Sequence, residues 1–180
     1  MKLYIFRHGQ TDGNKLKICQ TPDFELNAEG IKQAEELRDK LAPVNLPVIY
    51  ASPFERAGKT GHIVASAHNT PVEVVDGLQE MRFGEAEGMF ETDMIKKYGQ
   101  ELFNQLVDVP DSHWNVKIPG GESKSEALER FKQALAYIKK NCRHYTAGVA
   151  THGHVMRLFW YDRFNEDRIF DNCEYFELEI

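Results

Sequence analysis

The chain is constrained most strongly by an alternation of short apolar runs with longer amphipathic stretches. Apolar runs of a length typical of buried strands lie at residues 3–6, 48–51, 72–75 and 147–150, and residues 175–180 alternate like an edge strand. Stretches with helical periodicity lie between them, at residues 28–41, 54–67 and 92–107 and from 123 onward. Such alternation predicts an α/β sandwich with a mostly parallel central sheet.

Two of the predicted helices carry clear start signals. Asn27 is a good N-cap for the stretch 28–41, and Ser123 with Glu126 forms a capping box before the late helix. Helical spacing predicts the buried side of the first of these helices at Ile31, Ala34, Leu37 and Leu41. It predicts the buried side of the late helix at Leu128, Phe131, Leu135 and Ile138.

Length and composition narrow the class of protein. With 180 residues and a formal net charge of −6, we expect a single domain over 1–180 that does not bind nucleic acid. The three cysteines are far apart and show no spacing typical of disulfide frameworks or zinc sites. We see no apolar run long enough for a membrane helix and no signal peptide, so we predict a cytoplasmic protein that does not bind membranes. The sequence leaves open whether it is a monomer or a homodimer.

Charged and titratable residues follow the predicted strands where each strand ends. Arg7 and His8 follow the first strand, Arg56 comes shortly after the second, Glu80 follows the third and His152 follows the fourth. Ligands of parallel sheets bind at the carboxyl ends of the strands, so we expect these five side chains in one pocket. Placing such charges together is costly unless an anionic ligand or a specific network compensates them.

The residue types in this predicted pocket favour phosphoryl transfer. Arginine presents planar donors that match phosphate oxygens, so two arginines and a protonated histidine would stabilise the transferring group. A second histidine would be the nucleophile, and a carboxyl group would protonate the leaving alcohol. Two other classes stay open, a metal-dependent hydrolase using the His152-x-His154 spacing and a non-catalytic phosphate-binding module. We expect neither a metal site nor a cofactor.

Five motifs in chain order resemble the histidine phosphatase superfamily, the phosphoglycerate mutase-like proteins. They are Arg7-His8-Gly9-Gln10-Thr11, Ser52-Pro53 with Arg56-Ala57, Leu78-Gln79-Glu80, Gly120-Gly121-Glu122-Ser123 and Thr151-His152-Gly153. The resemblance implies a three-layer α/β/α sandwich in which residues 88–123 are inserted as a lid. It also implies that no metal is needed.

The resemblance also implies roles for individual residues. His8 would be the phosphoryl-accepting nucleophile, Glu80 the proton donor and acceptor, and Arg7, Arg56 and His152 the groups that hold the phosphoryl oxygens. Four further residues are candidates for substrate binding. These are Thr11, Asn14, Gly153 and, in the insertion, Trp114.

The pattern favours a phosphomonoesterase acting on a small phosphorylated metabolite over a cofactor-dependent phosphoglycerate mutase. Mutases that resemble this chain carry a Lys eleven residues after the catalytic Glu, where this chain has Glu91, and they carry an Arg pair in the insertion. Fewer cationic contacts would shorten the residence of a bisphosphorylated intermediate, which favours hydrolysis. His154 departs from the usual His-Gly-Gly, and we expect it to be mainly structural because it leads into the next helix.

Overall fold

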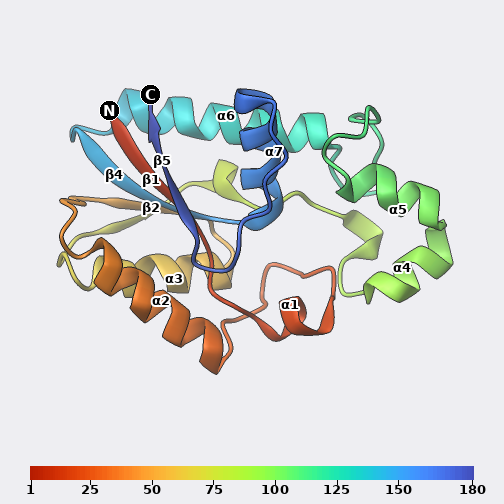
Figure 1. Cartoon of the computed structure of the whole chain (residues 1–180), viewed down its shortest axis with the longest axis horizontal. Coiled ribbons are helices and arrows are strands. Elements are labelled where there is room, and N and C mark those ends of the chain that lie inside the picture. The colour runs from red at the N-terminus through yellow and green to blue at the C-terminus, as the bar shows by residue number, and fades with distance from the viewer.

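A five-stranded sheet in the order β3-β2-β4-β1-β5 forms the centre of the computed structural model, which describes residues 1–180 (Figure 1). The strands are β1 (Lys2–Arg7), β2 (Ile49–Ala51), β3 (Val72–Val74), β4 (Thr146–Thr151) and β5 (Tyr175–Glu179). The first four are parallel, and β5 is antiparallel to β1. The prediction of a mostly parallel sheet is therefore confirmed.

Helices cover both faces of this sheet, which gives the predicted three layers. The helices are α1 (Asp12–Leu16), α2 (Ala28–Leu41), α3 (Glu55–Ala65), α4 (Glu91–Tyr98), α5 (Gln100–Val107), α6 (Lys124–Asn141) and α7 (Gly153–Phe164). Figure 1 shows α2 and α3 on one face, α6 and α7 on the other, and α4 and α5 beyond the carboxyl ends of the strands. None of these helices has the length and apolar character needed to cross a membrane.

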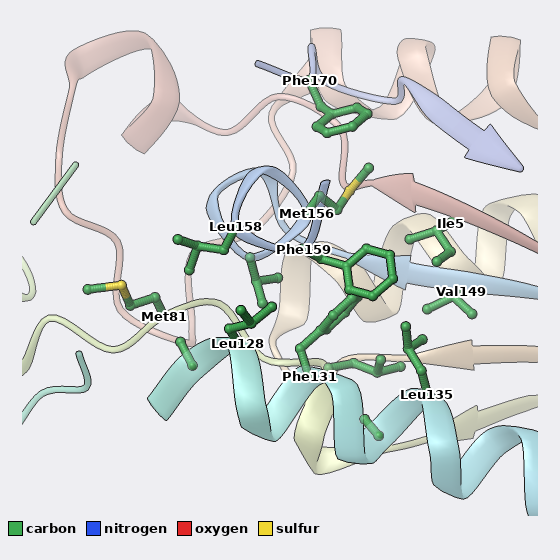
Figure 2. Close-up of a cluster of buried hydrophobic side chains, with 14 of the residues drawn as sticks. Ile5, Met81, Leu128, Phe131, Leu135, Val149, Met156, Leu158, Phe159 and Phe170 are labelled. Carbon is green, nitrogen blue, oxygen red and sulfur yellow. The ribbon is translucent and has the colours of Figure 1, made fainter. Parts of the chain in front are cut away.

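Successive side chains of β1 point to opposite faces of the sheet, which builds two hydrophobic cores. Leu3 and Ile5 belong to the larger core, and Tyr4 and Phe6 belong to the smaller one on the side of α2 and α3. Figure 2 shows the larger core, which lies between the sheet, α6 and α7. These two cores fix β1 from both sides and so hold the residues that follow it.

Local sequence patterns predicted the positions of most helices and strands. Asn27 caps α2 by accepting a hydrogen bond from the Gly30 N–H, and the capping box of Ser123 and Glu126 is present at α6. The whole predicted buried side of α6 is buried, whereas in α2 the side chain of Ile31 is 39% exposed.

Three expectations need correction. The predicted helix 92–107 is two helices, because Gly99 adopts φ +91° between α4 and α5. β3 was expected to be buried, but it is an outer strand of the sheet, and Val74 is 64% exposed. The five-residue helix α1 was not predicted, because one and a half turns show no periodicity.

The insertion 88–123 is packed onto the rest of the domain. Met94 and Leu106 belong to the larger core. The buried Lys124 donates from Nζ to the backbone carbonyls of Asp108 (2.6 Å) and Asp111 (3.3 Å). The segment is thus anchored to the start of α6.

Candidate active site

A cavity of about 380 Å³ opens at the carboxyl ends of β1 and β4. Six of the nine predicted site residues line it, namely Arg7, His8, Asn14, Arg56, Glu80 and Gly153. His152 is fully buried behind this surface, and its ring centroid lies 5.2 Å from that of His8. The expected convergence of the strand ends is present. Thr11 and Trp114 do not line the cavity.

His8 is held so that one ring nitrogen is free to react. Its backbone N–H donates to the Thr151 carbonyl (3.0 Å), and its carbonyl accepts from Asn172 Nδ2 (3.0 Å). Nδ1 lies 2.7 Å from the Gly9 carbonyl, which can only accept, so we place the proton on Nδ1 and the lone pair on Nε2. Burial and the charges of Arg56 and Arg7 hold the pKa of His8 well below its usual range. The ring is therefore neutral, with an unprotonated Nε2.

Two arginines next to His8 carry buried donors without partners. Arg7 Nη1 donates to the Phe170 carbonyl (2.6 Å), and Arg56 Nη1 donates to the Thr21 carbonyl (2.9 Å). The Nε atoms of both arginines are buried and have no hydrogen-bond partner in the protein. Burial lowers the pKa of Arg56 to about 10, which keeps it charged at neutral pH. Two buried cations with unused donors indicate a site for an anion such as a phosphoryl group.

In the protein without a bound anion, the His152 ring is neutral and offers one N–H as a hydrogen-bond donor. Ser52 Oγ accepts from the Phe54 N–H (3.2 Å) and lies 2.8 Å from His152 Nε2. The ring is the only acceptor within reach of the buried Ser52 hydroxyl, so we assign the hydroxyl as the donor and Nε2 as the acceptor. The proton of the ring is then on Nδ1, which is buried and has no partner. Burial and Arg56 hold the pKa of His152 well below its usual range. The expectation of a protonated second histidine is therefore wrong for the protein alone, and Nδ1–H takes its place as donor.

Glu80 lines the cavity and accepts hydrogen bonds from the start of α7. Its Oε1 accepts from the backbone N–H groups of Met81 (3.0 Å) and Val155 (2.9 Å), and its Oε2 accepts from that of His154 (2.9 Å). The N–H groups of His154 and Val155 are among those that the start of α7 leaves without intrahelical partners. Three backbone bonds thus hold the carboxyl group in place on the cavity wall.

Thr11 is hydrogen-bonded to two residues that line the cavity. It is the N-cap of α1, where its Oγ1 accepts from the Asn14 N–H (3.0 Å) and its own N–H donates to Asn14 Oδ1 (3.1 Å). Its hydroxyl also lies 2.7 Å from Gln20 Oε1. Asn14 and Gln20 both line the cavity, whereas Thr11 is fully buried beneath them. The prediction of a direct substrate contact is corrected to a positioning role.

Trp114 was predicted to touch the substrate, and its position contradicts this. Its ring stacks on Tyr161 of α7 with centroids 6.1 Å apart, and Lys124 Nζ lies 5.6 Å from the ring centroid. The indole packs against the larger core. There its apolar surface is removed from water, whereas at the open mouth of the cavity it would stay hydrated. Of the insertion, only Glu91 lines the cavity.

Some cavity residues had no signal in the sequence. Phe170 and Asn172 hold Arg7 and His8 across separations of 163 and 164 residues, from a loop without any motif. Arg157 and His154 both line the cavity as well. His154 departs from the motif, and the sequence predicts a mainly structural role for it.

With this geometry in view, we compared the chain with known proteins. The model of the histidine phosphatase superfamily (branch 1) matches residues 3–176. The chain belongs to the histidine phosphatase superfamily. The resemblance of the five motifs is thereby confirmed.

Relatives in this superfamily include phosphatases. A putative phosphoserine phosphatase 2 from Hydrogenobacter thermophilus is 32% identical over 141 residues, which are 78% of this chain and 68% of the relative. The adenosylcobalamin/alpha-ribazole phosphatase of Escherichia coli is 29% identical over 163 residues, 88% of this chain and 76% of the relative. The structure of Bacillus stearothermophilus YhfR superposes with a TM-score of 0.88 at 24% identity, covering 99% of this chain and 91% of YhfR, and shows the shared fold.

Proposed function

We propose that this protein is a metal-independent phosphomonoesterase that acts through a phosphohistidine on a small phosphorylated metabolite. The observation that carries the proposal is the tautomer of His8. The Gly9 carbonyl accepts a hydrogen bond from Nδ1–H, which leaves the Nε2 lone pair free at a cavity that Arg7 and Arg56 also line. The phosphatase relatives support the same activity.

In the first step, His8 Nε2 attacks the phosphorus atom and the ester P–O bond breaks. The Nε donors of Arg7 and Arg56 and the Nδ1–H of His152, which have no partner in the protein, would bind the phosphoryl oxygens as charge develops on them. The leaving oxygen takes a proton from Glu80 and departs as an alcohol. The products of this step are a phosphohistidine, whose Nδ1–H still donates to Gly9, and a Glu80 carboxylate.

In the second step, water attacks the phosphorus atom and the N–P bond breaks. The Glu80 carboxylate accepts the proton that the water loses, which returns the residue to its starting state. Inorganic phosphate leaves, and the electron pair of the N–P bond returns to His8 Nε2. Each turnover thus consumes one water and yields one alcohol and one phosphate.

Side chains supply the charge that balances the phosphoryl group. No group of three or more His, Cys, Asp or Glu side chains is arranged to hold a metal ion. Both arginines remain charged at working pH, so they would stabilise the transition state without one. Hydrolysis is favoured over the mutase alternative because Glu91, which lines the cavity, would repel the second anionic group of a phosphoglycerate.

The proposal is tested by phosphate release from p-nitrophenyl phosphate and a panel of metabolite monoesters in the presence of EDTA. Wild type is expected to release phosphate, and His8→Ala to lose at least a thousandfold in kcat. Acid-labile phosphate should be trapped on the wild-type chain and not on the variant. Activity that EDTA abolishes, or an unchanged His8→Ala variant, would refute the mechanism. Faster isomerisation of 3-phosphoglycerate than phosphate release would establish the mutase.

The role of Glu80 is tested with leaving groups of different basicity. An alkyl alkoxide needs a proton in order to leave, whereas p-nitrophenolate does not. Glu80→Gln is therefore expected to lower kcat by about 10²–10⁴-fold for alkyl phosphates and by much less for p-nitrophenyl phosphate. Glu85→Gln is the matched control, because Glu85 is exposed and does not line the cavity. Equal losses for both substrates would remove Glu80 from the proton transfer.

A further inference from the structure

Beyond the phosphoryl site, the cavity has a second part that would surround the leaving group. Its polar lining residues are Gln20, Glu91, His154 and Arg157, and apolar surface comes from Met81, Phe83, Ile169 and Phe170. Gln20 already accepts from the Thr11 hydroxyl, and its amide is uncharged. The charges of the other three polar residues therefore decide which leaving group fits.

Arg157 is the one cation in this part of the cavity, and the protein itself neutralises it. Its Nε and Nη2 donate to the two carboxylate oxygens of Asp167 at 2.6 and 2.8 Å. Its Nη1 donates to the Val107 carbonyl at 2.9 Å. Three of the five N–H donors of Arg157 are thus used and its charge is paired with Asp167, so the residue attracts a second anionic group of a substrate only weakly.

His154 presents an unused acceptor on the same wall. Its backbone N–H is fixed on Glu80, so its side chain lies next to the proposed acid. Nε2 is buried and has no partner in the protein. We assign the ring proton to Nδ1, the tautomer in which Nε2 is an acceptor. Burial is the main cause that lowers the pKa of His154, which keeps the ring neutral.

Glu91 supplies a second acceptor, with a negative charge. It is the first residue of α4, where its backbone N–H donates to the Lys17 carbonyl (2.9 Å). Its carboxylate lines the cavity and forms no ion pair within the chain. A carboxylate at a helix N-terminus is favourable, so Glu91 is stable there without a partner.

We propose that the substrate's leaving alcohol carries hydroxyl or ammonium donors and no second anionic group, and that His154 and Glu91 select it. This inference rests on the proposed phosphatase function. Nε2 of His154 and the Glu91 carboxylate accept from the leaving group, and a carboxylate on the leaving group meets Glu91 with no free cation to balance it. The substrate class is a monophosphate of a polyol or an amino alcohol.

The test compares four esters of similar size by kcat/KM, namely glycerol 3-phosphate, phosphoethanolamine, n-propyl phosphate and 3-phosphoglycerate. The first two are expected to exceed propyl phosphate by about tenfold each, the worth of a hydrogen bond to a buried acceptor. 3-Phosphoglycerate is expected to be the poorest of the four. A wild-type enzyme that prefers 3-phosphoglycerate or does not discriminate would overturn the inference while the phosphatase function stands. No release from any ester would overturn both.

Variants of His154 assign the selection to its acceptor. His154→Leu is expected to reduce the ratio of glycerol 3-phosphate to propyl phosphate about tenfold, and His154→Gln, which keeps an acceptor, to restore most of it. His68→Leu is the matched control, because His68 also has a buried Nε2 without a partner but lies outside the cavity. An unchanged ratio in His154→Leu, or equal losses on all esters, would refute the role of His154.

The charge of Glu91 is tested by reversal. Glu91→Lys is expected to raise kcat/KM for 3-phosphoglycerate relative to phosphoethanolamine at least tenfold, and the gain should shrink with added salt. Glu101→Lys is the control, because it makes the same change of net charge at an exposed position on the neighbouring helix α5. An equal effect of both variants would show that net charge alone acts, which would refute a contact at Glu91.

Discussion

Replacing Gly153 by alanine should separate the activity of this protein from its stability. Gly153 is the first residue of α7, and Arg7 passes directly over it. A Cβ at this position would lie 2.8 Å from Arg7 Nε and 3.1 Å from Cδ and Cζ. Ordinary contacts are near 3.5 Å or longer, so the guanidinium must move by roughly half an ångström. The atom displaced most is the donor proposed to bind the phosphoryl group.

The size of the effect follows from the bond that would be lost. A hydrogen bond from a charged group contributes ~1.5–3 kcal/mol, which corresponds to about 10- to 150-fold in kcat/KM. The fold itself should not suffer, because alanine is up to about 1 kcal/mol more favourable than glycine in a helix. Gly153→Ala is thus expected to lose activity while its midpoint of urea unfolding is kept or raised.

The assay is kcat/KM for p-nitrophenyl phosphate together with urea unfolding of the same preparations. Gly58→Ala is the matched control, because Gly58 lies within α3 and a Cβ there meets only the Ser52 carbonyl at 3.8 Å. It should gain stability and keep its activity. An active Gly153→Ala variant would show that Arg7 Nε is not needed for the phosphoryl group. A loss of activity matched by a loss of stability would point to a general disruption of the fold.

Three further outcomes are expected. Ser52→Ala removes the hydroxyl that sets the His152 tautomer and should lower kcat about tenfold with little change in KM, measured by steady-state kinetics. Because His8 and His152 have pKa values below those of the unfolded chain, the unfolded chain binds more protons, and the free energy of unfolding should fall as the pH drops below about 6.5. His152→Gln should flatten that fall in urea titrations between about pH 5 and 7, and an unchanged slope would contradict the assignment. Lys124→Met leaves two carbonyls without a donor and should cost about 1–3 kcal/mol in urea unfolding, with Lys140→Met on the same helix as the exposed control.

Much of the fold follows from local chemistry and was predictable. The apolar run of β1, the N-cap at Asn27 and the capping box at Ser123 each depend on a few neighbouring residues. Gly99 shows the limit of such reasoning, since the periodicity runs through it while its positive φ divides the helix. The position of β3 at the sheet edge likewise depends on the order of strands, which no local pattern contains.

The candidate site likewise has features that the sequence predicts and features that it does not. The sequence by itself determined that the five residues following the strands meet, because parallel strands bring their carboxyl ends to one edge and each of the four predicted parallel strands was followed by Arg, His or Glu. Only the tertiary structure decided where the protons lie and which charges are free. The tautomer of His152 depends on Ser52, 100 residues away. Arg157 keeps its charge, which Asp167 pairs, and it donates to the Val107 carbonyl, 50 residues away. Such contacts depend on how distant segments pack, which no local pattern in the sequence contains, so the proposed specificity of the cavity could be inferred only from the tertiary structure.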